Sequence, residues 1–553
     1  MVPISELRAK SDAQFNAGNP SQNVWVAASA GSGKTSVLVD RLLRLLLAGV
    51  APHRLLCLTF TKAAAAEMSD RLFRELGRWV VQSDQDLIAT LEETTGASVD
   101  EKQRDLARRL FARVLETPGG LRIQTIHGFC ESLLARFPLE AGQPPNFDVL
   151  DERQASGLLA GARDEILLEA NNEEGLNRAL KTISSRIGEL RFLDVVNRLA
   201  GERGRIDRLI SRHGGIEKLV AATFLALDVD QDETEHKVIS TACAGRFNEP
   251  ELRAAADVLL QGSKTDVVRG DILAAWLQSS LEERVDGFDA YASAYLTNHG
   301  SVRQTLITKA SQARMPDAED VLKNEAERIL GVAARIRAVN VAYGTAALLE
   351  LGDAILARYQ DAKRSRNALD YDDLILRARA LLTQSAITPW ILYKLDGGID
   401  HILVDEAQDT SPEQWEVVFA LAEEFFAGVG ARETLRTVFI VGDEKQSIYS
   451  FQGADPKAFE EMRHLFQKRA AGAGTGWQEV PLLTSYRSVP VVLDFVDRVF
   501  RDEAVRDGVT FDDEWRPHTA FREGFGGLVE VWPTTSASAP EKAPWDAPLR
   551  QVL

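Results

Sequence analysis

A strand, a glycine-rich loop and a helix follow one another near the N-terminus, and this succession constrains the fold more than any other feature. The apolar run 24–28 is short enough for a buried strand, whereas the apolar residues after Thr35 recur at helical spacing. Asp40 and Arg44 are four residues apart, so we expect them to pair on the polar face of this helix, which Gly49 would end. The succession predicts one repeat of an α/β layer.

The loop between this strand and this helix has the residue types of a Walker A phosphate-binding loop. Two of its residues, Gly31 and Gly33, allow the backbone to turn so that N–H groups face a phosphate, and the helix N-terminus adds partial positive charge. Lys34 would reach the β- and γ-phosphates of ATP, and Thr35 would bind Mg²⁺. An ordinary glycine turn is the alternative, but it does not need Lys-Thr at this place. The complete loop is Ala28, Ser29, Ala30, Gly31, Ser32, Gly33, Lys34 and Thr35, in which Ala28 replaces the usual first glycine.

A second apolar run, 402–404, ends in the carboxylates Asp405 and Glu406. Asp405 at the strand tip would hold Mg²⁺, and Glu406 would orient and deprotonate the attacking water. The alternative is a strand that ends in solvated acids before a helix. Together with the Walker A loop, the acidic strand end indicates a nucleoside triphosphatase. A small-molecule kinase would not need the several hundred residues between the motifs, and a transporter-type ATPase would carry an LSGGQ-like signature, which this sequence lacks.

Further short apolar runs predict more strands of the same parallel sheet, with helices on both faces. They are residues 55–60, 121–126 and 438–441. The turn-rich stretch EAGQPPNF (140–147) marks a boundary, and beyond it the pattern is helical until α/β patterning resumes near residue 369. We therefore expect an α/β lobe formed by residues 1–145 and 366–479, a mostly helical insertion at 146–365, and a further segment at 480–553.

Composition excludes several classes of protein. A net charge of −18 over 553 residues argues against binding of nucleic acid over the whole surface, although a local basic groove remains possible. Cys57, Cys130 and Cys243 are too few for a disulfide framework, a four-cysteine zinc site or an iron–sulfur cluster. No apolar run approaches the about 20 residues of a membrane-spanning helix, and no secretory signal is visible, so we expect a cytoplasmic protein without a membrane segment.

The order of the motifs along residues 10–500 resembles that of the UvrD/Rep-like superfamily 1 DNA helicases. Within this family the chain is most similar to the AddA branch, the helicase–nuclease subunits of bacterial double-strand break repair, in the alphaproteobacterial form. The long gap between the loop and the acidic strand matches the enlarged helical insertion of that branch. The resemblance rests on Gln14, AASAGSGKT (27–35), LTFTKAAAAEM (58–68), IQTIHGFC (123–130), LDYDDLI (369–375), ILVDEAQD (402–409), VGDEKQSIYSFQGADP (441–456) and TSYRS (484–488).

The resemblance implies roles for residues around ATP. Gln14 matches the glutamine that reads adenine, and Tyr486 matches the ring that stacks on it. Gln446 matches the residue that senses the γ-phosphate and couples it to DNA, while Arg487 matches an arginine finger that stabilises the phosphoryl transition state. The alternatives are an exposed glutamine, an aromatic ring in the core and a surface arginine.

The resemblance also implies a single-stranded DNA site, in which bases stack on rings while hydroxyls and N–H groups hold phosphates. Core packing is the alternative for the aromatic residues, above all for Phe60 at the end of a strand, and His127 could equally be structural. Phe451 stands where many relatives have tryptophan. Gln452 stands where compact helicases have arginine, which argues against a strong phosphate contact there. The matching positions are Phe60, Thr61, Lys62, Thr125, His127, Tyr449 and Phe451.

Two functions remain open at this point. The chain could be the N-terminal motor portion of an ATP-driven 3′-to-5′ DNA translocase that acts on single strands and duplex ends in recombinational repair, with an AddB-like partner. It could instead be a truncated, non-catalytic module that binds nucleotide, single-stranded DNA or the partner. The remaining motifs of a second RecA-like lobe and the nuclease of the AddA branch find no match before Leu553, so we expect a fragment or a truncated product.

Overall fold

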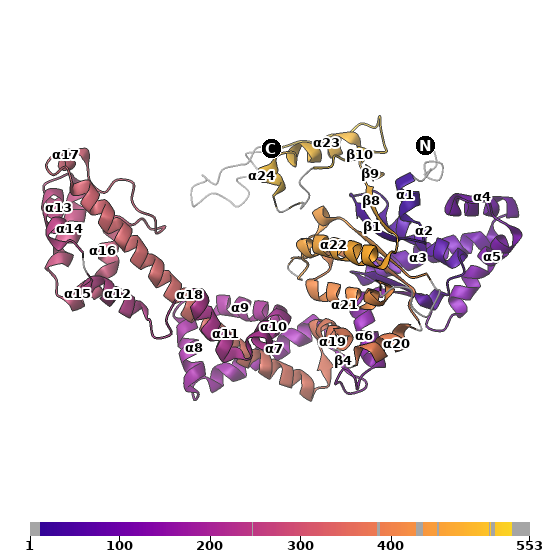
Figure 1. Ribbon diagram of the computed structural model, residues 1–553, viewed down its shortest axis with the longest axis horizontal. Coiled ribbons are helices and arrows are strands. Elements are labelled where there is room, and N and C mark those ends of the chain that lie inside the picture. The colour runs from indigo at the N-terminus through magenta and orange to yellow at the C-terminus, as the bar shows by residue number, and fades with distance from the viewer. Residues whose placement is uncertain are drawn as a thin grey trace, which may run out of the picture. The chain divides into compact units, whose positions relative to one another are not determined.

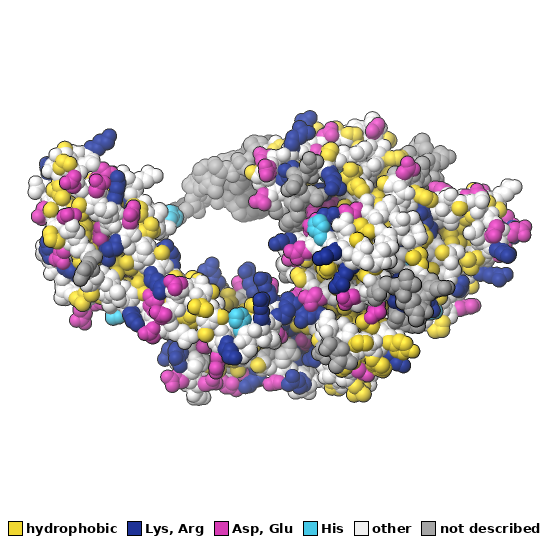
Figure 2. All heavy atoms as spheres, in the orientation of Figure 1, with side chains coloured by type: hydrophobic (Ala, Val, Ile, Leu, Met, Phe, Trp, Pro, Cys, Tyr) yellow, Lys and Arg dark blue, Asp and Glu magenta, His cyan; other side chains and the backbone are white. Residues whose placement is uncertain are grey.

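The computed structural model describes residues 12–245, 247–383, 387–396, 398–426, 435–450, 453–507, 509 and 515–532. The chain folds into two compact units (Figure 1). The first unit comprises Met1–Val149 and Leu369–Leu553, and the second comprises Leu150–Ala368. On the face shown in Figure 2, Lys and Arg side chains are interspersed with Asp and Glu side chains.

The first unit is built on a six-stranded sheet in the order β3-β2-β6-β7-β1-β8. Each of its strand pairs is parallel, so the carboxyl ends of the strands meet at one edge. The register sets Thr59 opposite Thr125 and Val26 opposite Val441. The strands are β1 (Asn23–Ala28), β2 (Leu55–Thr59), β3 (Arg122–Thr125), β6 (His401–Val404), β7 (Thr437–Gly442) and β8 (Trp477–Leu482).

Successive strand residues supply two separate cores, because neighbouring side chains point to opposite faces of a sheet. On β1, Trp25 joins the core beneath α6, α19, α21 and α22, whereas Val24 and Val26 join the core beneath α2, α3, α4 and α5. The prediction of a parallel sheet with helices on both faces is confirmed. The helices of this unit are α1 (Asp12–Ala17), α2 (Lys34–Leu47), α3 (Lys62–Val81), α4 (Asp84–Thr95), α5 (Glu101–Glu116), α6 (Ile126–Arg136), α19 (Tyr371–Thr383), α20 (Thr388–Asp396), α21 (Pro412–Ala422), α22 (Pro456–Ala473), α23 (Pro490–Val499) and α24 (Glu503–Arg506).

The expectation for Arg44 was wrong about the exposure of its face of the helix but not about Asp40, whose charge acts on the guanidinium. Although Asp40 lies four residues away, Arg44 does not lie on a solvated helix face but is 6 % exposed. The cause is α1, which packs beside α2 so that the Phe15 ring covers the guanidinium. The spacing of residues shows which side chains share one face of a helix, but it does not show which other element of the fold covers that face.

The expected boundary at residue 480 falls inside β8, which the sequence did not predict as a strand of the first sheet. After β8, a short strand β9 (Thr484–Ser485) pairs in parallel with β10 (Thr519–Ala520). Asp497 on α23 accepts hydrogen bonds from Trp515 Nε1 (3.0 Å) and from the backbone N–H of His518 (3.0 Å), which ties this segment together.

The second unit is helical, in agreement with the sequence pattern, and an isolated bridge joins Leu296 to Val302. Two short strands, β4 (Asp148–Val149) and β5 (Ala368–Leu369), pair where the chain leaves and re-enters the first unit. The helices are α7 (Glu152–Glu169), α8 (Glu174–Ser184), α9 (Glu189–Gly201), α10 (Arg203–His213), α11 (Ile216–Ala226), α12 (Glu235–Ala244), α13 (Glu249–Leu260), α14 (Lys264–Gln278), α15 (Leu281–Asp286), α16 (Phe288–Tyr295), α17 (Lys309–Gln312) and α18 (Ala318–Ser365).

The 48-residue helix α18 organises this unit. Its length and one apolar 18-residue window meet the simple criteria for a membrane span. Its apolar residues also form three cores within the unit, for example Ile329 with Tyr291 and Leu351 with Ile183. Because a core helix of a globular unit meets the same criteria, α18 is weak evidence for a membrane.

Candidate nucleotide-binding site

The glycine loop joins the carboxyl end of β1 to the N-terminus of α2. Gly31 (φ 75°) and Gly33 (φ 86°) adopt the left-handed backbone conformation that glycine tolerates best. A Cβ added to Gly31 would lie 2.6 Å from Arg487 Cβ and 2.9 Å from Ser485 Oγ, so a larger residue would also collide with the chain that crosses the loop. Backbone geometry therefore favours glycine at both positions, and close packing excludes a side chain at Gly31.

Lys34 and Glu406, which are far apart in the sequence, meet at this edge of the sheet. Lys34 Nζ donates to Glu406 Oε2 over 3.1 Å, and the side chains are 10 % and 36 % exposed. Lys34 starts α2 after β1, whereas Glu406 follows β6, two strands away in the sheet. The structure thus brings the Walker A loop and the acidic strand end together.

Asp405 and Glu406 differ in environment although they are neighbours. Asp405 is 5 % exposed, and burial together with the charge of Glu406 raises its pKa to about 6. Glu406 has φ 49°, a left-handed conformation uncommon for a non-glycine residue, and its N–H donates to Asp405 Oδ1 over 3.0 Å. The left-handed backbone at Glu406 is a strained position of the kind that clusters at functional sites.

The residues of the loop fit a magnesium-bound triphosphate. Ser32 Oγ is buried and has no hydrogen-bond partner among the residues that the structure describes. No group of three or more His, Cys, Asp or Glu side chains that could hold a metal occurs in the described ranges. Mg²⁺ usually takes one or two protein oxygens and completes its shell with phosphates and water, so Thr35 and Asp405 form a suitable donor set.

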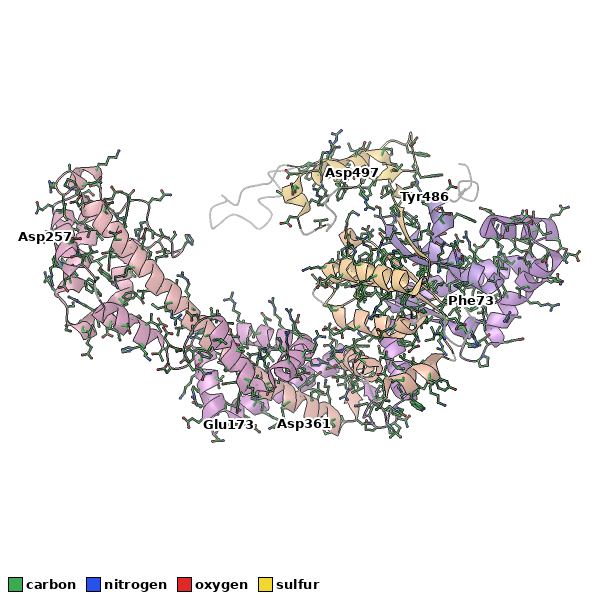
Figure 3. The ribbon with its side chains drawn as sticks, viewed as in Figure 1. Phe73, Glu173, Asp257, Asp361, Tyr486 and Asp497 are labelled. Carbon is green, nitrogen blue, oxygen red and sulfur yellow. The ribbon has the colours of Figure 1, made fainter. Side chains whose placement is uncertain are left out.

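Gln14 is not an exposed glutamine. It is 9 % exposed, its Nε2 donates to the carbonyl oxygen of Ser32 over 2.9 Å, and its Oε1 accepts from the hydroxyl of Tyr486 over 3.3 Å. Tyr486 N–H also donates to Gly31 O over 2.9 Å. Gln14 therefore contacts the phosphate loop, and so does Tyr486, which is labelled in Figure 3.

Arg487 follows Tyr486 and is exposed. No hydrogen bond or ion pair of its guanidinium with a described residue is present, which leaves the group available to an anion. Its Cβ lies close enough to Gly31 to leave no room for a side chain there. The structure thus brings Arg487 to the loop.

Gln408 links the acidic strand end to the next loop, and the sequence reasoning missed it as a functional residue. Its Nε2 donates to Glu406 Oε2 (2.8 Å) and Asp409 Oδ2 (3.2 Å), while its Oε1 accepts from Asp443 N–H (2.9 Å). The carboxylate of Asp443 in turn accepts from Gln446 Nε2. The signal that could have found Gln408 is a buried amide within a run of carboxylates, because such an amide needs fixed partners.

Two of the residues assigned to DNA have structural roles that the sequence did not reveal. Thr61 Oγ1 accepts from Ala64 N–H and caps α3, and Thr125 Oγ1 accepts from Gly128 N–H and caps α6, both over 3.0 Å. Because β2 and β3 are neighbours, these caps place two helix N-termini at the same edge of the sheet. Exposed Lys62 follows the first cap.

Aromatic side chains gather beside these helix starts. The rings of Phe60 and Tyr449 lie 4.5 Å apart, and His127 lies 5.5 Å from Tyr371, which is 43 % exposed and was not singled out in the sequence. Burial lowers the pKa of His127, so the neutral ring is favoured. Phe60 is half-buried, as expected at a strand end, and Phe451 lies outside the described residues.

Comparisons with a family model and with individual known proteins both point to helicases. The model of the UvrD/REP helicase N-terminal domain matches residues 10–467. The chain is also similar to proteins named as ATP-dependent helicase/nuclease subunits of the AddA kind. It is 27 % identical to that of Levilactobacillus brevis over 536 residues, which cover 87 % of this chain and 37 % of the relative. It is 26 % identical to that of Enterococcus faecalis over 534 residues, which cover 87 % and 37 %, respectively. It thus spans well under half the length of these relatives.

Proposed function

We propose that this chain, which belongs to the UvrD/REP helicase family, is the N-terminal motor portion of an ATP-dependent DNA helicase of the AddA type. The observation that carries the proposal is the 3.1 Å contact between Lys34 and Glu406 at the carboxyl edge of one sheet. This contact joins the two motifs that a nucleoside triphosphatase needs, in a chain whose relatives are named as helicase/nuclease subunits.

ATP and Mg²⁺ are the proposed ligands of the phosphate loop. Lys34 and the loop N–H groups would bind the β- and γ-phosphates, and Thr35 and Asp405 would hold the metal ion, which supplies charge neutralisation when bound. Gln14 and Tyr486 would contact adenine from their places beside Ser32 and Gly31.

Glu406 is the proposed general base. Its carboxylate is ion-paired to Lys34. A γ-phosphate would attract Lys34 and leave the carboxylate to accept a proton from the attacking water. Arg487 would add positive charge to the same phosphate from the chain that crosses the loop.

A chain of contacts leads from this base toward the proposed DNA site. Glu406 contacts Gln408, Gln408 contacts Asp443, and Asp443 contacts Gln446. Tyr449 lies three residues after Gln446 and packs on Phe60. A shift at the γ-phosphate would therefore reach the aromatic residues through few intermediates, which is what coupling of hydrolysis to movement along DNA requires.

Single-stranded DNA is the proposed substrate of the carboxyl edge near α3 and α6. The capped helix N-termini suit phosphates, and Phe60, Tyr449 and His127 suit stacking of bases. From the resemblance to the AddA branch we also propose the 3′-to-5′ direction, action at duplex ends in double-strand break repair by homologous recombination, an AddB-like partner and a cytoplasmic location. The arrangement of residues 480–553 as the start of a second RecA-like lobe is proposed on the same ground.

ATP hydrolysis with and without single-stranded DNA tests the proposal. We expect DNA to stimulate hydrolysis and Lys34→Ala to abolish it, with Arg113→Met, an exposed arginine of α5, as the unaffected control. Because the chain spans only part of its relatives, we expect a low rate. Nucleotide binding without any turnover would favour the alternative of a binding module, and absence of both would contradict the proposal.

A further inference from the structure

The side chain of Phe15, next to Gln14 on α1, is held between a buried arginine and a glycine. The guanidinium carbon of Arg44 lies 4.1 Å from the centroid of the Phe15 ring. Arg44 Nη1 also donates to the carbonyl oxygen of Phe15 over 2.9 Å. At the edge of the ring, a Cβ added to Gly96 would lie 2.3 Å from Phe15 Cζ, so α4 ends directly against α1.

The contact with Phe15 and the charge of Asp40 together compensate for the burial of Arg44. Nε and Nη2 of Arg44 are buried without a hydrogen-bond partner among the described residues, and burial lowers the pKa of the group. A buried cation needs compensation, and the face of an aromatic ring provides part of it. Gly18 is also fitted to the guanidinium, since a Cβ there would lie 3.1 Å from Arg44 Cζ. The arrangement therefore depends on Arg44 and Phe15 together.

A second arginine on the same side of α2 holds the continuation of the segment. Arg41 is fully buried and donates to the carbonyl oxygens of Asn19 and Gln22 and to Thr437 Oγ1. The helix that starts at Lys34 thus binds three backbone carbonyls of the stretch 15–22. In Figure 1, α1 lies beside α2, and these bonds explain why.

We infer that Arg44 and Phe15 are positioning residues that set the preference of the nucleotide site for adenine. They fix α1 on α2 and thereby hold the Gln14 amide at Ser32, while neither side chain enters the phosphate loop. Loss of the contact between Arg44 and Phe15 releases the Gln14 side chain but leaves Lys34 and the loop N–H groups in place. The part of the affinity that depends on the base is lost, and the part that depends on the phosphates remains. This inference rests on the proposed role of Gln14 in the proposed function.

Equilibrium binding of fluorescent ATP and GTP analogues, with Mg²⁺ present, tests the inference on the full chain. Arg44→Met keeps an apolar stem and removes the guanidinium, and Phe15→Leu removes the ring while the backbone hydrogen bond stays. We expect wild-type protein to prefer ATP. Arg44→Met and Gln14→Ala should each weaken ATP binding about tenfold and GTP binding less than about twofold. Phe15→Leu should have a smaller effect in the same direction, and Arg113→Met none.

The double variant gives the decisive result. When two residues act through the same group, the losses of binding free energy on replacing them do not add. The double variant Gln14→Ala/Arg44→Met should therefore bind ATP no more weakly than Gln14→Ala alone. Equal losses for ATP and GTP, additive losses, or no preference for ATP in wild-type protein would overturn the inference. Thermal unfolding shows whether Arg44→Met still folds. If it does not, the effect of Phe15→Leu on ATP and GTP binding is used to test the inference instead. Wild-type protein that binds neither analogue, or binding that survives Lys34→Ala, would instead contradict the proposed function.

Discussion

Lys34 Nζ lies 3.1 Å from Glu406 Oε2, so the proposed phosphate-binding cation and the proposed base form an ion pair. Nucleotide must compete with Glu406 for Lys34.

Replacement of the base should separate binding from turnover. In Glu406→Gln the ion pair is lost, so Lys34 is free for the phosphates and ATP should bind at least as tightly as to wild-type protein. Turnover should fall about 10²- to 10⁴-fold, the usual contribution of a general base. Titration with a fluorescent ATP analogue and steady-state phosphate release measure the two effects, and weaker binding together with normal turnover would contradict the assignment.

Removal of the Gln408 amide should affect coupling more than basal hydrolysis. Gln408→Leu leaves Asp443 N–H without its acceptor and removes one of the two side-chain donors to Glu406 Oε2, the other being Lys34. We expect unfolding to be easier by about 1–3 kcal/mol and the DNA-stimulated rate to fall by a larger factor than the basal rate. Denaturant unfolding and ATPase assays with and without single-stranded DNA check this. Equal factors for the two rates would show that Gln408 only supports the fold.

The aromatic pair should contribute to DNA binding without affecting nucleotide. Phe60→Ala or Tyr449→Ala removes one ring of a contacting pair. Each should weaken binding of an oligothymidylate by about 1–3 kcal/mol, the usual value of a stacked base. Fluorescence anisotropy measures this, with ATP binding unchanged. Tyr449→Ala is the safer variant because Phe60 ends a buried strand. Tyr393→Ala, which removes an aromatic residue that is 69 % exposed on α20, is the control.

Acid should destabilise the first unit through His401. Burial, reinforced by the charge of Arg41, lowers the pKa of His401 from 6.5 to about 4, and Nδ1 pairs with Thr437 Oγ1 over 2.8 Å. Below pH 6.5 the unfolded chain binds a proton that the folded chain does not, so stability is present above pH 6.5 and is lost as pH falls toward 4.

The loss from His401 should be on the order of 3 kcal/mol and should be absent in His401→Gln. Denaturant unfolding at pH 7.5, 6, 5 and 4 measures it, and His464→Gln, an exposed histidine on α22, serves as the control. The same pH dependence in His401→Gln as in wild-type protein would assign the acid sensitivity to other groups.

The sequence predicted local patterns well and partners across the fold poorly. The parallel strands around Leu58, Leu403 and Phe439 could be predicted because each apolar run is short and ends in polar residues. The burial of Arg44 could not be predicted, because it depends on the Phe15 ring, which belongs to another helix. The helix caps formed by Thr61 and Thr125 could not be predicted either. A threonine at a strand end is equally suited to contact a phosphate and to cap the helix that follows.

The edge strand β8 has a mechanical consequence. It ends at Leu482, and Tyr486 N–H already binds Gly31 O, so only Leu483, Thr484 and Ser485 separate the sheet from the phosphate loop. Three residues span at most about 11 Å, so the downstream chain is held close to the loop. A displacement of the downstream chain would therefore act directly on the backbone of the proposed phosphate loop, and we expect nucleotide release to respond to tension on this chain.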